Sequence, residues 1–167
     1  NNKDLLQAMV DYGDSCKEAE DAGDGKPRCP DYIGKCILLI ATRLATKPNF
    51  SGYTYKEDMI SDGVENCLQY MGNFNIEKSQ NPFAYFTQII WFAFLRRIQK
   101  EKKQMYIRFK SSQQMMTELS MIESGDAKVQ LNEPPEYISE FINDFEKKLH
   151  SKKVQSEESN DTSETKE

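Results

Sequence analysis

The chain has 167 residues, of which 38% are hydrophobic and 29% charged, and its formal net charge is −5. This length suits one compact domain with a modest core and a tail. The apolar run Ile89–Leu95 is much shorter than the about 20 residues that cross a bilayer, so we expect no membrane-spanning segment. No basic and apolar leader opens the sequence, so we expect a protein of the cytoplasm.

The N-terminal part has the pattern of helices separated by breaks. Apolar residues at helical spacing predict a short helix over Asn1–Tyr12, with Asn2 as its cap. Glycines and prolines among acidic residues predict a surface loop over 14–31. A second helix follows and ends before Pro48, because the residue before a proline disfavours the helical conformation. Thr54 is the expected cap of the next helix.

Two further helices contain most of the candidate functional residues. An uninterrupted apolar stripe from Met59 to Met71, with polar residues on the opposite side, predicts an amphipathic helix that Gly72 closes. Pro82 is well placed as the first residue of the following helix. That helix is expected to reach about Gln114, and its change from apolar to basic character near Arg96 could mark a bend.

The C-terminal part is weaker in pattern. Apolar residues recur at helical spacing over Tyr137–Leu149 and predict a last amphipathic helix. The segment 151–167 is almost entirely polar and is expected to be disordered. The sequence thus predicts an all-α protein: a compact helical domain over 1–115, a linker and amphipathic helix over 116–150, and a tail.

Nothing in the sequence predicts a catalytic or metal centre. The four cysteines contain no CxxC pair, and the single histidine, His150, lies in a charged stretch, so we expect no metal and no cofactor. Cys36 and Cys67 fall in phase with apolar stripes, which favours a place in the core. Phosphate-binding, metalloprotease and hydrolase motifs are absent, and we expect no enzymatic activity.

One stretch combines aromatic and basic residues in an unusual way. Six aromatic residues lie between Phe83 and Phe94, and seven basic residues with one acidic residue follow between Arg96 and Lys110. An ordinary core helix with a charged end is one interpretation. A nucleic-acid surface is another, because cations engage phosphates and rings stack on unpaired bases. An interfacial membrane helix fits less well, because such a helix has its cations on the face opposite its rings, whereas here the cations follow the rings along the chain.

Two adjacent stretches of the chain read EDMISDGVENCLQYMGNF and NPFAYFTQIIWFAFLRRIQK. Together they resemble the polymerase-binding and promoter-opening helices of bacterial sigma factors. More narrowly, three stretches resemble the small late-transcription sigma factors of T-even-type bacteriophages and their cyanophage relatives, and they read NNKDLLQAMVDYGD, NFSGYTYKEDMISDGVE and NPFAYFTQ. The resemblance covers about Asn1 to Lys110. It implies a compact helical domain like sigma region 2, which acts in transcription initiation in the host cell.

The resemblance implies a protein partner and a set of contact residues. The partner is the host RNA polymerase core, bound at the clamp coiled coil of the largest subunit. The residues that match the polymerase-facing positions of the family lie on the polar side of the predicted 59–71 helix, where acidic groups suit a basic partner. They are Asp58, Ser61, Asp62 and Glu65.

The same resemblance implies binding and opening of a short A·T-rich late promoter. Phe83 and Phe86 match the aromatic promoter-opening positions of the family. The tandem tryptophans of primary sigma factors are replaced by Ile89 and Ile90, so we expect the capture of a DNA strand either to be weaker or to rely on Tyr85 or Trp91. The basic continuation supplies the phosphate contacts. It consists of Arg96, Arg97, Lys100, Lys102 and Lys103.

In the T-even family, a DNA-loaded sliding clamp and a separate coactivator assist the sigma factor. The clamp holds a hydrophobic motif at the end of the chain, and this sequence ends in ESNDTSETKE. The Tyr137–Leu149 helix could dock on the clamp instead, or could pack back onto the body. The alternative to a sigma factor is a helical DNA-binding or polymerase-binding adaptor without promoter specificity.

Overall fold

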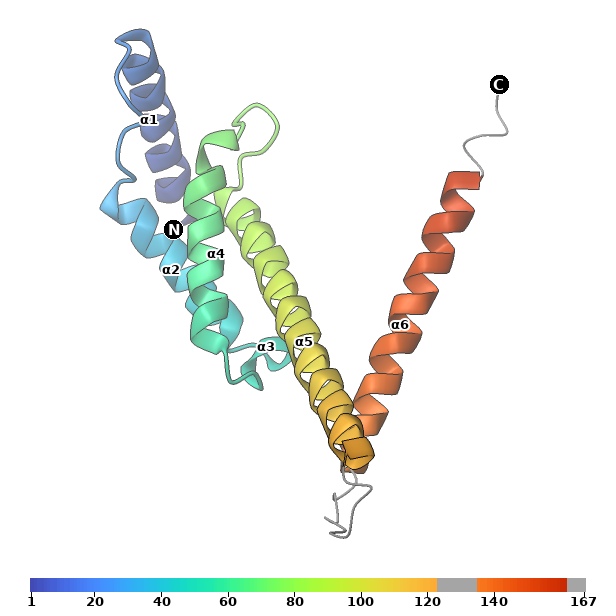
Figure 1. Ribbon diagram of the computed structural model, residues 1–167. Coiled ribbons are helices and arrows are strands. Elements are labelled where there is room, and N and C mark those ends of the chain that lie inside the picture. The colour runs from blue at the N-terminus through green and yellow to red at the C-terminus, as the bar shows by residue number, and fades with distance from the viewer. Residues whose placement is uncertain (123–134, 162–167) are drawn as a thin grey trace. The chain divides into compact units, whose positions relative to one another are not determined.

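The computed structural model describes the backbone of residues 1–122 and 135–161, and it is all-α (Figure 1). The described residues form α-helices and one 3-10 turn and contain no strand, which confirms the predicted fold class. The chain divides into two compact units, Asn1–Gln99 and Lys100–Glu167. This division falls earlier than the expected domain boundary at 115, so the basic residues beyond Gln99 belong to the second unit.

Helix α1 (Asn2–Asp21) is longer than the sequence pattern predicted. Its N-cap is Asn1, whose side chain accepts a hydrogen bond from the backbone N–H of Lys3, and not Asn2. The predicted loop over 14–31 was therefore wrong in its first part. The helix continues because Cys16 extends the buried stripe of Leu5, Met9 and Tyr12.

Helix α2 (Asp31–Ala45) ends where the sequence predicted, before Pro48. Its core face consists of Ile33, Ile37, Ile40 and Ala41, all buried. Pro48 then opens a single turn, α3 (Pro48–Ser51), which places Phe50 in the core. Thr54 does not cap the following helix, because the residue at the cap position is Tyr55.

Helix α4 (Lys56–Tyr70) lies beside the earlier part of α5 (Pro82–Ile122), up to Gln99, in the first unit (Figure 1). The 3-10 turn η1 (Met71–Asn73) closes α4, and the Asn81 side chain caps α5 by accepting a hydrogen bond from the N–H of Ala84. Gly63 faces α5, where a Cβ would lie 3.1 Å from Cγ2 of Ile90. The glycine therefore permits the close approach of the two helices.

The second unit contains the later part of α5 and α6 (Glu136–Asp161). Their contact includes the stacked rings of Tyr106 and Phe145, 4.6 Å apart, and the edge-on pair Phe109 and Phe141. This arrangement agrees with packing onto the chain itself, one of the two alternatives for this amphipathic helix. The predicted end of α5 near Gln114 was wrong, because the helix continues to Ile122.

Helix α6 also continues into the segment that we expected to be disordered. Its last residue is Asp161, so the prediction of disorder from Ser151 was wrong as far as that residue. The remainder of the predicted tail, 162–167, and most of the predicted linker, 123–134, lie outside the described residues.

Candidate functional site

The polar face of α4 carries the residues predicted to bind polymerase. Asp58, Ser61 and Glu65 are exposed, while Met59, Gly63 and Cys67 on the other side are buried against the rest of the first unit. Burial raises the pKa of the Cys67 thiol to about 12, so this cysteine belongs to the core as the sequence predicted. The apolar side fixes α4 in place and leaves the carboxylates of Asp58 and Glu65 in solvent.

Asp62 differs from its neighbours because it is paired. Nε of Arg97 donates to Oδ2 of Asp62 at 2.6 Å, and Nη2 of Arg97 donates to Oδ1 at 2.7 Å. Both side chains are mostly covered, with 28% of Asp62 and 18% of Arg97 exposed. The sequence assigned these two residues to different partners, polymerase and DNA, but the structure places them in contact with each other.

A second cation of the predicted DNA-binding set contacts α4 as well. Nη2 of Arg96 donates to Oδ1 of Asn66 at 2.7 Å, and the Asn66 amide donates to the backbone carbonyl of Asp62. Sequence reasoning missed Asn66, and helical phase alone gives no signal for it beyond its place on the polar side of α4. Arg96 remains exposed, so its remaining donors face solvent.

The four predicted DNA-binding rings occupy very different environments. Phe83 is 52% exposed in the first turn of α5, whereas Phe86 is 0% exposed and belongs to the core. Phe86 therefore cannot stack on a base in this conformation, because helical phase turns it toward α4. Phe92, which the sequence did not single out, is 50% exposed on the same helix.

Tyr85 and Trp91 are half-buried and already have partners within the first unit. The Tyr85 hydroxyl donates to the carbonyl of Tyr70 at 2.7 Å, and burial raises its pKa. The Trp91 ring lies edge-on to Phe50, with ring centroids 4.8 Å apart. Each ring offers only part of its surface to a ligand.

The remaining predicted cations, Lys100, Lys102 and Lys103, are exposed and lie in the second unit. In that unit the Glu146 carboxylate accepts hydrogen bonds from Lys110 and from the Tyr106 hydroxyl, both at 2.9 Å. These two hydrogen bonds lower the pKa of Glu146, and the bond from Lys110 has the larger effect. Lys110 is thus engaged in an internal contact.

The apolar face of α6 that we considered for the sliding clamp is largely covered within the second unit. Ile142 is buried and Phe141 and Phe145 pack on α5, while Tyr137 and Leu149 are exposed. Docking through the whole stripe would require this packing to open.

No metal-binding cluster of histidine, cysteine, aspartate or glutamate occurs among the described residues. Over the same residues, no helix has the length and apolar character needed to cross a membrane. Comparison of the sequence with protein-family models and with curated proteins gives no match.

Proposed function

We propose that this chain is a phage late-transcription sigma factor, which binds the host RNA polymerase core and directs recognition and opening of an A·T-rich late promoter. One observation carries the proposal: the α4 helix, which lies in one of the stretches that resemble sigma factors, exposes Asp58, Ser61 and Glu65 while its opposite side is anchored in the core. An exposed acidic face on a fixed helix suits docking on a basic partner helix. The clamp coiled coil of the largest polymerase subunit is the proposed partner.

The promoter side of the proposal rests on fewer residues than the sequence suggested. Phe83 and Phe92 are the well-exposed rings of α5, and stacking contributes about 1 to 3 kcal/mol per unpaired base. Lys100, Lys102 and Lys103 are exposed and can contact phosphates. Arg97 and Phe86 have structural roles in the first unit, so we leave them out of the proposed DNA contacts.

Promoter-specific transcription tests the proposal directly. The chain is added to host core polymerase on two run-off templates that differ only in the A·T-rich late element. A sigma factor gives transcripts that depend on the element. Equal transcription from both templates, or co-elution with polymerase without initiation, would leave only an adaptor.

A pair of variants then tests the polymerase-binding face. Asp58→Lys with Glu65→Lys should abolish co-elution with core polymerase, because both carboxylates are exposed on the proposed contact face. Asp11→Lys with Glu18→Lys, at two exposed positions on α1, is the matched double reversal outside this face. If this α1 variant loses polymerase to the same extent, the effect is one of net charge and α4 is not the contact.

A further inference from the structure

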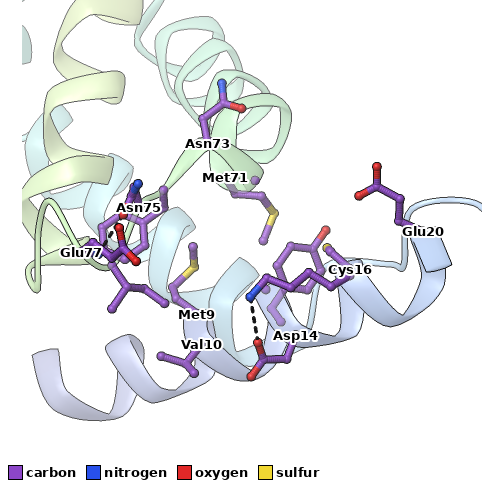
Figure 2. Close-up of a pocket in the computed structure, with 15 residues that line it drawn as sticks. Met9, Val10, Asp14, Cys16, Glu20, Met71, Asn73, Asn75 and Glu77 are labelled. Carbon is purple, nitrogen blue, oxygen red and sulfur yellow. Dashed lines mark hydrogen bonds and ion pairs between the residues drawn. The ribbon is translucent and has the colours of Figure 1, made fainter.

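A groove of about 590 Å³ lies between α1 and the segment that links α4 to α5 (Figure 2). One wall comes from α1, between Met9 and Glu20, and the other from residues 71–77. Met9, Tyr12 and Met71 are the buried lining residues, so the deepest part of the groove is apolar and rich in sulfur. All of these residues belong to the first unit.

The wall formed by residues 71–77 is held by its own hydrogen bonds. The Asn75 carboxamide oxygen accepts from the backbone N–H groups of Glu77, at 2.8 Å, and Lys78, at 3.3 Å. Beside it, the Lys26 amine lies 3.5 Å from the position that a Cβ on Gly72 would take. The two bonds to Asn75 fix the backbone of this wall.

The charges around the groove are predominantly negative. Figure 2 shows Glu20 and Glu77 at opposite ends, and neither forms an ion pair with any residue that the structure describes. The one lysine in the lining, Lys17, lies 3.3 Å from the Asp14 carboxylate. The lining contains three carboxylates, those of Asp14, Glu20 and Glu77, against one lysine, so the groove favours a cation.

Gly13 lines the groove in the middle of α1, where glycine is less favourable than alanine. A Cβ at this position would meet nothing within 4 Å, so packing within the chain does not require a glycine. The missing side chain instead leaves the groove wider.

From these features we infer that the groove is a docking site for a basic segment of a protein partner. This segment places an apolar side chain on Met9 and Met71. Arginines or lysines on either side of it pair with Glu20 and Glu77. Methionine side chains adapt to an apolar group of varied shape. The carboxylates at the two ends provide charge complementarity and fix the register. This surface is distinct from the polar face of α4 and does not depend on the proposed function.

A labelled peptide tests the inference on the full chain. The probe is a short fluorescein-labelled peptide with one leucine between arginines, and the readout is fluorescence anisotropy. Two matched peptides replace the arginines by glutamates or the leucine by glycine. The arginine and leucine peptide should bind, and each replacement should abolish or strongly weaken binding. Absence of binding, or equal binding of the glutamate peptide, would overturn the proposal.

Variants of the groove locate the peptide. Gly13→Leu places a bulky side chain at the wall of the groove and should abolish binding, whereas Gly13→Ala, whose Cβ has no neighbour within 4 Å, should bind better than Gly13→Leu. Glu20→Gln with Glu77→Gln should weaken binding about threefold to tenfold, as expected for two exposed ion pairs. Thermal melts confirm that each variant is folded.

The matched control removes the same charge from α1 outside the groove, through Asp11→Asn with Glu18→Gln. Binding should be unchanged in this control, and a loss equal to that of the groove variant would assign the effect to the general charge of α1. A concentration-dependent dimer in sedimentation velocity that Gly13→Leu removes would assign the groove to a second copy of the chain. Either result would overturn the proposal.

Discussion

The guanidinium of Arg97 on α5 forms two hydrogen bonds with the carboxylate of Asp62 on α4, at 2.6 and 2.7 Å. We expect Asp62→Asn and Arg97→Met each to lower the free energy of unfolding by about 1 to 3 kcal/mol, because each breaks the charge-assisted pairing of two largely covered side chains. The double variant should lose clearly less than the sum of the two. Urea unfolding followed by circular dichroism measures all three, and additive losses would contradict a direct contact.

The control for this cycle is the exposed pair of Asp14 and Lys17 on α1, in which both side chains are mostly in solvent. Asp14→Asn should change the free energy of unfolding by less than about 1 kcal/mol, because exposed ion pairs contribute little.

Phe83 and Phe86 were equivalent candidates in the sequence, and their exposure separates them. Phe83→Ala should leave the free energy of unfolding within about 0.5 kcal/mol of the original chain while weakening binding to A·T-rich single-stranded DNA. Phe86→Ala should lower the free energy of unfolding by about 3 to 5 kcal/mol, because it empties a site in the core. Chemical denaturation and DNA binding by anisotropy distinguish the two, and unaltered DNA binding by the folded Phe83 variant would remove this ring from the promoter surface.

The contact of α4 with α5 depends on the small size of Gly63. Gly63→Ala should lower the free energy of unfolding by about 1 to 3 kcal/mol, because the added Cβ would lie 3.1 Å from Ile90 and 3.2 Å from Phe94. Gly34→Ala on α2 is the matched control, since its Cβ would meet nothing within 4 Å and alanine is the better helix former. A Gly63 variant as stable as the Gly34 variant would show that the helices separate easily.

Glu146 determines how the stability of the second unit changes with pH in the acidic range. Its pKa lies below the ordinary value of 4.5 because Lys110 and then Tyr106 donate hydrogen bonds to it. Because the pKa of Glu146 is lower in the folded state than in the unfolded state, its contribution to stability is complete at pH values above the unfolded-state pKa. The contribution is lost as the pH falls through the folded-state pKa. We therefore expect the hydrogen-exchange protection factors of α6, which are corrected for the intrinsic pH dependence of exchange, to fall below about pH 4.5, and Glu146→Gln to remove this acid-dependent step.

The same contacts raise the pKa of Tyr106 and of Lys110. The contribution of these two groups to stability is therefore present at pH values below their ordinary pKa values and is lost as the pH rises through the raised pKa values. An NMR titration of the Glu146 carboxyl group provides a check at residue level. Lys110→Met should bring the Glu146 pKa back toward its ordinary value, and Tyr106→Phe should do so by less. An unchanged titration in Lys110→Met would show that the contact does not form in solution.

Helical periodicity was enough to predict the all-α class and the start of α5 at Pro82, because these depend on local spacing and on the geometry of proline. It failed where tertiary contacts override a local signal. The glycines and acidic residues after Tyr12 suggested a loop, but Cys16 finds a place against the core and prolongs α1.

The candidate site shows the same division between local and tertiary information. The exposed polar side of α4 follows from its apolar stripe, and so the environments of Asp58 and Glu65 were predictable. The bond between Asp62 and Arg97 was not, because it joins residues 35 positions apart whose relation depends on how two helices pack. Apolar residues nearly encircle α5, so periodicity could not decide that Phe83 is exposed while Phe86 is buried.

The single tryptophan of the chain is Trp91, and its edge-on contact with Phe50 lies within the first unit. The second unit contains no tryptophan. Indole emission therefore reports on the unfolding of one unit only, whereas circular dichroism reports on the helices of both. Comparing the two signals in one titration would show whether the units unfold together or separately, without any label being added.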